Sequence, residues 1–261
     1  MVAMPDTVWW AVYCLVWLAV SVLSAMDVGG IYDMLQNNRP VPGQRLSLGG
    51  GEVVFVRDPT IDHAVLPETV PTSALAALTF SGLTLLVLME LGSPLVNVVR
   101  AVATWLQATA LTELLTSLGK HYMGILRPNF YAGCGWSDET MACAPGSHIK
   151  FRKSFPSGHS AHSACFAALV TLHLLRHADL AYGKGAHKRM RALLWLALLP
   201  APMALFVAAS RVHDNWHHPA DVVAGSLLGT GCAALTHVLL WERPVGASAQ
   251  LDSEAEVRPL V

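Results

Sequence analysis

Six stretches of this 261-residue sequence are apolar over nearly the length of a membrane-spanning helix. A helix needs about 20 mostly apolar residues to cross the hydrocarbon core of a bilayer. The sequence therefore predicts an all-α fold, a six-helix transmembrane bundle that forms a single domain over residues 1–241. The predicted helices are 8–26, 73–91, 101–118, 160–175, 192–209 and 222–241.

The composition supports lipid as the solvent for much of the chain. Charged residues make up 13% of the sequence, about half of the roughly 25% that is typical of globular domains, and 53% of residues are hydrophobic. The formal net charge of −1 favours no charged partner and argues against a nucleic-acid-binding protein.

The first apolar stretch could be a membrane helix or a cleaved signal peptide. No Lys or Arg precedes Arg39, so the basic segment that begins a signal peptide is missing. Trp9, Trp10, Tyr13 and Trp17 are typical of an aromatic anchor at a membrane interface. We therefore expect a membrane helix here.

The segments between the helices fall into two groups. Each crossing changes the side of the membrane, so the polar segment 29–72 shares one face with the segments 119–159 and 210–221. The tight turn near residue 93 and the basic loop 176–191 belong to the other face. The tail 242–261 is polar, and we expect it to be disordered.

Three polar clusters fall on the first of these faces. They are Lys120 with Arg127, then Ser157-Gly158-His159, and then Arg211 with His217 and Asp221. A phosphate monoester carries charge on three oxygens, and its transfer depends mainly on positioning and electrostatic stabilisation. The cations of Lys120, Arg127 and Arg211 suit such a group, since Arg engages two oxygens at once and Lys acts as a point charge.

Ser157 and Gly158 precede the fourth apolar stretch, so they should lie at the amino terminus of a helix. Backbone N–H groups at that position form an anion site. Gly158 also permits close approach of a phosphate to the main chain.

His217 is the predicted nucleophile. Asp221 follows it by four residues, one helical turn, and Pro219 between them suits the start of a helix. The carboxylate can accept from the imidazole Nδ1–H and leave Nε2 to attack phosphorus. His159 then serves as general acid for the leaving oxygen and as general base for the hydrolytic water.

These clusters resemble the signature of the type 2 phosphatidic acid phosphatase superfamily, and most nearly its eukaryotic lipid phosphate phosphatases. Residues 210–225 (SRVHDNWHHPADVVAG) resemble the third motif and residues 154–160 (SFPSGHS) the second. Residues 58–61 (DPTI) and 69–71 (TVP) resemble the first long loop. Ile125 departs from the family, in which many members have Arg after the glycine that is Gly124 here.

The resemblance implies a multi-pass membrane enzyme that hydrolyses phosphatidate, lysophosphatidate or diacylglycerol pyrophosphate through a phosphohistidine. It implies no metal and no cofactor, the phospholipid and the bilayer as partners, cytosolic termini and a lumenal or extracellular active site. Alternative substrates are polyprenyl diphosphates and glucose 6-phosphate. A different class is a catalytically inactive, lipid-binding relative, but such relatives usually lose motif residues and all of them are present here.

Three further observations leave alternatives open. Cys134 and Cys143 share one loop and either form a disulfide or stay free thiols. Glu113 lies within an apolar stretch, which makes it a functional candidate, although a pairing role inside the bundle is the simpler reading. Basic residues on both faces make the positive-inside rule ambiguous.

Overall fold

Long helices make up most of the fold. The computed structural model describes residues 6–25, 40–48, 50, 53–145, 147 and 149–241. The predicted disordered tail 242–261 and residues 29–39 of the polar segment lie outside these ranges. The elements are α1 (Asp6–Ala25), β1 (Gly43–Ser47), β2 (Val53–Arg57), η1 (Pro59–Ile61), α3 (Thr72–Met89), α4 (Leu95–Met123), α5 (Phe130–Cys134), η2 (Ile149–Arg152), α6 (Gly158–Gly183), α7 (His187–Leu196), α8 (Pro200–His213) and α9 (Pro219–Trp241).

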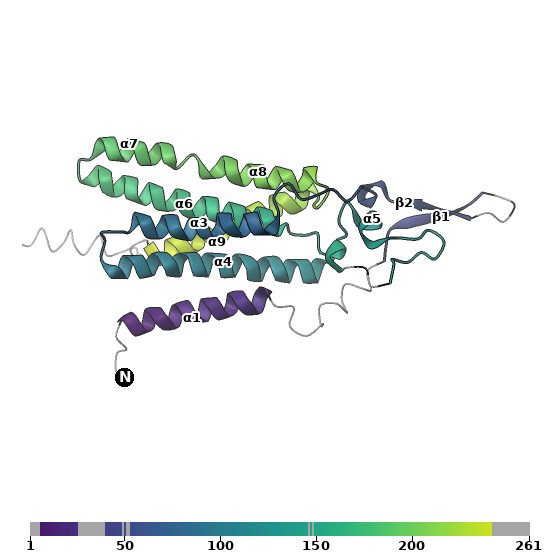
Figure 1. The fold of residues 1–261 in the computed structure, drawn as a ribbon, viewed down its shortest axis with the longest axis horizontal. Helices are drawn as coiled ribbons and strands as arrows, with labels where there is room; N and C mark the ends of the chain where they lie inside the picture. The colour runs from purple at the N-terminus through teal and green to yellow at the C-terminus, as the bar shows by residue number, and fades with distance from the viewer. Residues whose placement is uncertain are drawn as a thin grey trace, which may run out of the picture.

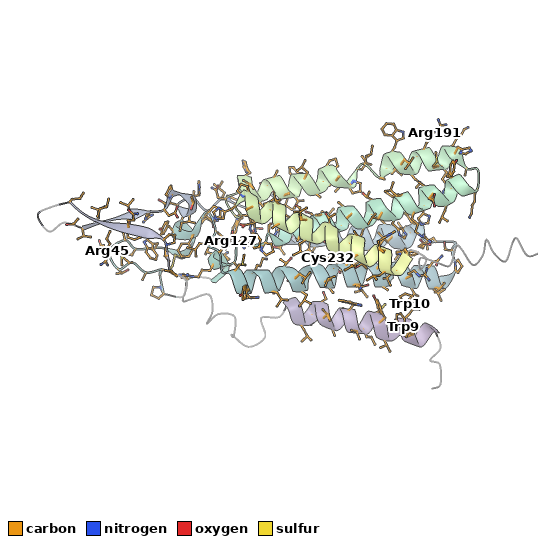
Figure 2. All side chains as sticks on the ribbon, turned by 180° about the vertical axis from the view of Figure 1, so that it is seen from behind. Trp9, Trp10, Arg45, Arg127, Arg191 and Cys232 are labelled. Atoms are coloured by element: carbon orange, nitrogen blue, oxygen red, sulfur yellow. A yellow bond between two sulfur atoms is a disulfide. The ribbon has the colours of Figure 1, made fainter. Side chains whose placement is uncertain are left out.

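The long helices lie side by side along one axis, and the hairpin β1–β2 and α5 lie at one end of them (Figure 1). Helix α1 lies along α4 at the edge of the bundle. Arg45 and Arg127 belong to the hairpin end, whereas Trp9, Trp10 and Arg191 belong to the opposite end (Figure 2).

Helices α6 and α9 pack closely because glycines face the partner backbone. A Cβ at Gly225 would lie 2.4 Å from the carbonyl oxygen of Ser157, and one at Gly229 would lie 1.9 Å from that of Ala161. Small residues four apart let two helices approach closely in a membrane, where burial of apolar surface gives little drive for association. This contact fixes the start of α9 against the start of α6.

Four helical segments in the described residues are long and apolar enough to cross a membrane. They are Thr72–Met89, Gly158–Gly183, His187–His213 and Pro219–Trp241. The apolar part of α1, Trp9–Leu23, is shorter, and α4 carries Arg100, Glu113 and Lys120. Many large apolar side chains on the helix surfaces are exposed, as expected for a bundle in lipid.

Two details differ from the sequence prediction. The predicted helix 192–209 is divided into α7 and α8, because Pro200 lacks the N–H that a continuous helix would need. The predicted polar segment contains a two-stranded antiparallel hairpin in which Gly43 pairs with Arg57 and Ser47 with Val53. The β-branched residues of β2 favour a strand. Apart from this small hairpin the fold is helical, as the sequence predicts.

An apolar cluster lies beneath the loops at the hairpin end. It contains Ile61, Leu126, Phe130, Tyr131, Cys134, Phe151 and Trp216. Cys134 and Cys143 form a disulfide with their Cα atoms 5.2 Å apart, which decides between the two alternatives left open by the sequence. Arg57 at the end of β2 donates to Asp138 within the disulfide loop, so hairpin and loop are joined.

Candidate active site

The three predicted clusters meet at one cavity of about 290 Å³ at the hairpin end of the bundle. The lining residues relevant to its chemistry are Glu68, Glu113, Lys120, Arg127, Gly158, His159, His162, Arg211, Trp216 and His217. Ser157 and Asp221 are buried behind this lining. Six of the eight predicted site residues therefore face the cavity, and two support it from behind.

Helix α4 supplies Lys120 in its last turn and then ends at Gly124. Gly124 has φ 55°, and its N–H donates to the Lys120 carbonyl at 3.2 Å. A glycine accommodates this left-handed conformation without the cost of a Cβ. The chain then turns from the helix towards Arg127.

Arg127 lines the cavity and also joins three segments of the chain. Its Nε donates to the Lys150 carbonyl at 2.8 Å, its Nη1 to that of Trp216 at 3.2 Å and its Nη2 to that of Lys153 at 3.3 Å. The guanidinium has five N–H donors, so two remain for an anion. Burial, together with Arg211, lowers the pKa of Arg127 to about 10, which leaves it charged at neutral pH.

The second cluster begins α6. The Ser157 Oγ accepts from the Ser160 N–H at 3.4 Å, as an N-cap does, while the Ser157 N–H donates to the Asp221 carbonyl at 3.0 Å. The backbone N–H of Ser157 is thus already bonded, contrary to the expectation that it faces an anion. A Cβ at Gly158 would lie 2.9 Å from Lys120 Nζ, so a larger residue would displace the Lys120 ammonium.

A tight turn between α8 and α9 carries His217. The N–H groups of Trp216 and His217 both donate to the Arg211 carbonyl, at 3.1 and 3.2 Å, and Asn215 has φ 61°. Asn tolerates this conformation better than most residues. The turn directs His217 into the cavity and brings it beside the first turn of α9.

Asp221 is held where the sequence predicts a partner for His217. Its Oδ2 accepts from Ser154 Oγ at 2.6 Å and from the His218 N–H at 2.9 Å. The same oxygen lies 3.5 Å from His217 Nδ1, which exceeds the usual hydrogen-bond distance by about 0.5 Å. Catalytic hydrogen bonds are often long before substrate binds.

His217 is a neutral imidazole in this environment. Burial is the largest influence and lowers the pKa of His217 to about 3, and the Arg127 and Lys120 cations act in the same direction. The Asp221 carboxylate opposes them without restoring the ordinary value. Neutral imidazole has the free lone pair that a nucleophile requires.

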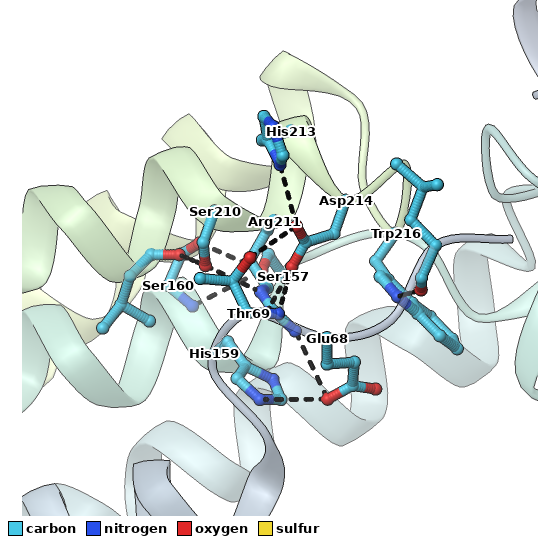
Figure 3. A network of polar contacts seen from close by, with 12 residues as sticks. Glu68, Thr69, Ser157, His159, Ser160, Ser210, Arg211, His213, Asp214 and Trp216 are labelled. Atoms are coloured by element: carbon cyan, nitrogen blue, oxygen red, sulfur yellow. Dashed lines mark hydrogen bonds and ion pairs between the residues drawn. The ribbon is translucent and has the colours of Figure 1, made fainter. Parts of the chain in front are cut away.

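Arg211 is oriented by an acid that the sequence analysis did not single out. Its Nη2 lies 3.1 Å from Asp214 Oδ2, and Asp214 accepts in turn from the N–H and the Oγ1 of Thr69, both at 2.7 Å (Figure 3). Burial raises the pKa of Asp214, but hydrogen bonds from His213 and Thr69 outweigh it and lower the pKa. The i,i+3 spacing of Arg211 and Asp214 was a signal for this pair.

Glu68 is a second acid that the sequence analysis missed. Its Oε2 lies 3.5 Å from Arg211 Nη1 and 3.9 Å from His159 Nε2 (Figure 3). Its carboxylate stands among groups that suit a phosphate oxygen. The adjoining segment 69–71, which resembles the family's first loop, was the one signal in the sequence.

Glu113 pairs within the bundle, as the simpler reading expected. Its Oε2 lies 2.8 Å from His162 Nε2, and both residues reach the wall of the cavity. His162 was assigned no role from the sequence. Its position one turn after His159 on α6 explains why it shares the cavity.

The chain matches the PAP2 superfamily over residues 101–244. That segment contains all eight predicted site residues and excludes the hairpin and the loop that carries Glu68.

Among curated proteins, the chain is similar to lipid phosphate phosphatase 1 of Arabidopsis thaliana, with 35% identity over 52% of this chain and 43% of the relative. It is 28% identical to human phospholipid phosphatase 2 over 70% of each chain, and 28% identical to rat phospholipid phosphatase 1 over 80% of this chain and 79% of the relative. The chain thus spans less than half the length of the plant relative. No solved structure matches it.

Proposed function

Because the chain belongs to the PAP2 superfamily, we propose that it is an integral-membrane phosphatase that removes phosphate from lipid phosphates such as phosphatidate, lysophosphatidate and diacylglycerol pyrophosphate. The names of the relatives, lipid phosphate phosphatase and phospholipid phosphatase, support this substrate class.

One observation carries the proposal. Three cations, Lys120, Arg127 and Arg211, and two imidazoles, His159 and His217, line a single cavity at the end of a membrane-type bundle. A phosphate dianion would find opposite charge there, while the acyl chains of its lipid would stay in the bilayer beside the helices. A soluble phosphate ester would not need this placement.

In the proposed first step, His217 Nε2 attacks phosphorus and the bond to the leaving oxygen breaks. His159, which enters this step as the imidazolium, donates a proton to that oxygen, which departs as an alcohol or as the remaining phosphate of a diphosphate. The charge of the transition state is stabilised by Lys120, Arg127 and Arg211. Asp221 holds the imidazolium that forms at His217.

In the second step, His159 accepts a proton from water, and the resulting hydroxide attacks the phosphohistidine. The P–N bond breaks, its electrons return to His217, and inorganic phosphate leaves. Both steps use the same three cations, and each conserves protons without a further reactant.

We propose that six segments cross the membrane, with α7 and α8 together forming one crossing. The disulfide supports a lumenal or extracellular position for the hairpin end, since such bonds persist in oxidising compartments. The termini would then face the cytosol.

The test is phosphate release by the full-length protein in detergent micelles with EDTA present. We expect turnover of phosphatidate and loss of at least about 1,000-fold in kcat for His217→Ala, since removal of a nucleophile leaves little residual catalysis. His63→Ala, an exposed histidine at the same end, is the matched control and should retain full activity. A His217→Ala rate near that of the wild type would contradict the nucleophile assignment.

A substrate panel decides the class of lipid. It should compare phosphatidate, lysophosphatidate and diacylglycerol pyrophosphate with a polyprenyl diphosphate and glucose 6-phosphate at equal surface concentration. A preference for the polyprenyl diphosphate or the sugar phosphate would overturn the proposed substrate class. No turnover of any of the five would favour an inactive, lipid-binding relative.

A further inference from the structure

A second cluster of polar residues lies at the end of the bundle away from the phosphatase cavity. It contains Glu90, the C-cap residue of α3, and His173 and His177 of α6. His177 follows His159 by 18 residues in α6, about 27 Å along the axis at 1.5 Å per residue. The cluster therefore has no direct contact with the phosphate pocket.

These residues are buried although they are polar. Glu90 and His173 are 1% and 0% exposed, and the side chain of His177 is 11% exposed. The ring of Trp241, the last residue of α9, packs on His173 with the ring centroids 5.0 Å apart. Polar groups in such a place need partners that compensate for lost hydration.

The ligand atoms of the three residues converge on one point. One atom from each residue lies within 4.8 Å of the others, and Glu90 Oε1 lies 3.0 Å from the Nε2 atoms of both His173 and His177. In a site with Zn–N and Zn–O bonds of about 2.0–2.1 Å, neighbouring ligand atoms are about 3 Å apart. The spacing therefore fits ligands that share one ion.

Hydrogen bonding does not account for His173. Both of its ring nitrogens are buried, and neither has a hydrogen-bond partner among the described residues, despite the short distance from Nε2 to Glu90 Oε1. His177 Nε2, by contrast, is hydrogen-bonded to Glu90 Oε1 at 3.0 Å, so Glu90 pairs with His177 and Arg176 while His173 points at the same oxygen without a bond. A cation shared by the imidazole and the Glu90 carboxylate would give both buried groups a partner.

We propose that Glu90, His173 and His177 bind a divalent transition-metal ion of the Zn²⁺ class, with water completing its coordination. Two imidazoles and a carboxylate are a recurrent ligand set for such ions. The i,i+4 histidines present one face of α6, and Glu90 comes from the turn between α3 and α4, so the ion links these helices. This site is separate from the cavity for which no metal was predicted.

Arg176 is the competitor for this site. Its Nη1 lies 2.9 Å from Glu90 Oε1, so an ordinary ion pair is the alternative explanation. Arg176 also stacks on Trp241, with Cζ 4.1 Å from the ring centroid. The guanidinium can keep this second contact when a metal ion takes Glu90.

The experiment uses full-length protein in detergent, stripped with a chelator, dialysed and then titrated with Zn²⁺ against a chromophoric competitor. Bound zinc is counted by atomic emission spectroscopy. We expect Glu90→Gln and His177→Ala to lose about one equivalent of zinc, or at least about tenfold in affinity, which loss of even an outer group can cost. His187→Ala removes an exposed histidine at the same end and should bind as the wild type does.

Arg176→Gln provides a readout that misfolding cannot imitate. With the competitor removed, zinc should bind several-fold more tightly than to the wild type, while an ion pair alone predicts no gain. Unchanged zinc binding in both Glu90→Gln and His177→Ala would overturn the proposal, and so would a failure of Arg176→Gln to tighten it. Zinc bound at the phosphatase histidines would persist in the Glu90 variant and is thereby distinguished.

Discussion

Glu68 places a negative charge in the cavity that we propose as the phosphate site. Its carboxylate lies 3.5 Å from Arg211 Nη1 and 3.9 Å from His159 Nε2, and it is partly exposed, so solvent screens it. A phosphate dianion that enters the cavity must either push the Glu68 carboxylate aside or bind next to it. Glu68 thus pairs with Arg211 and is expected to weaken the binding of a phosphate dianion.

Glu68→Gln should therefore bind inorganic phosphate more tightly. Two unit charges about 4 Å apart in a water-like dielectric repel by about 1 kcal/mol, or about fivefold in affinity. Product-inhibition constants for phosphate measure the effect. Glu139→Gln, the same change at an exposed residue of the disulfide loop, should leave the constant unchanged, and weaker inhibition in the Glu68 variant would refute the role.

The depressed pKa of His217 has a consequence for acid stability. Well above pH 6.5 the imidazole is neutral in both the folded and the unfolded chain. As the pH falls below 6.5 the unfolded imidazole takes up a proton, while the folded one stays neutral until about pH 3. The folded state therefore loses stability across this window, by up to about 2 kcal/mol at pH 5.

His217→Gln should lose less thermal stability than the wild type when the pH is lowered from 7 to 5. Melting temperatures in detergent at the two pH values provide the measurement. His63→Gln serves as the control, since that side chain is exposed. If the wild type and the His217 variant lost stability equally, burial of a neutral imidazole would not be a source of acid sensitivity.

At the residue scale, spacing in the sequence predicted most of the pocket. Fixed intervals such as His217 to Asp221 are local, and a helical turn converts them directly into proximity. Glu68 and Asp214 were missed because their roles depend on long-range contacts: Glu68 with Arg211, 143 residues apart, and Thr69 with Asp214, 145 residues apart. Such contacts are properties of the assembled fold.

At the scale of the elements, the close packing of α6 against α9 depends on glycines of α9, and Gly229 makes the tightest contact. A Cβ at Gly229 would meet the Ala161 carbonyl oxygen at 1.9 Å, whereas one at Gly231, two residues later, would meet nothing within 4 Å. Both glycines lie in the interior of α9. Alanine substitutions at the two positions are therefore expected to have opposite effects on stability.

Gly229→Ala should lower the melting temperature and the yield of folded protein, because backbone must move to admit the methyl group. Gly231→Ala should be neutral or stabilising, since alanine favours a helix over glycine by about 1 kcal/mol. Thermal unfolding in detergent compares the two. Equal stability of the two variants would mean that α6 and α9 can separate at no cost.

The existence of the helices could be predicted from apolar length, but their ends could not. The fourth apolar stretch ends at residue 175, yet α6 continues to Gly183, because Glu90 provides a buried partner for Arg176 and His177. The hairpin β1–β2 was missed because the surrounding polar residues conceal five-residue strands. Tertiary contacts determine both where α6 ends and that the two short strands pair.

At the scale of the whole molecule, two ends with different chemistry follow from the alternation of helices. The hairpin end holds the disulfide and the proposed phosphate pocket, and the opposite end holds the turn between α6 and α7. Under the proposed topology these ends face different compartments. The compartment that each end faces can be measured without knowledge of the substrate.

A cysteine at His63 and one at Lys184, both exposed, should react with a membrane-impermeant maleimide from opposite sides of sealed vesicles. His63→Cys should be labelled only from the lumenal or extracellular side and Lys184→Cys only from the cytosolic side. Wild-type protein, in which Cys165 and Cys232 are buried, gives the background. Labelling of both from one side would contradict an odd number of crossings between them.

The three carbonyl contacts of Arg127 limit how its variants can be interpreted. A substitution there removes a positive charge. It also removes the hydrogen bonds that hold together the peptide segments shaping the cavity. Kinetic losses at this position will therefore mix weaker anion recognition with faulty assembly. Lys120, whose ammonium lies at the tip of a flexible stem, is the better position at which to measure the worth of one cation.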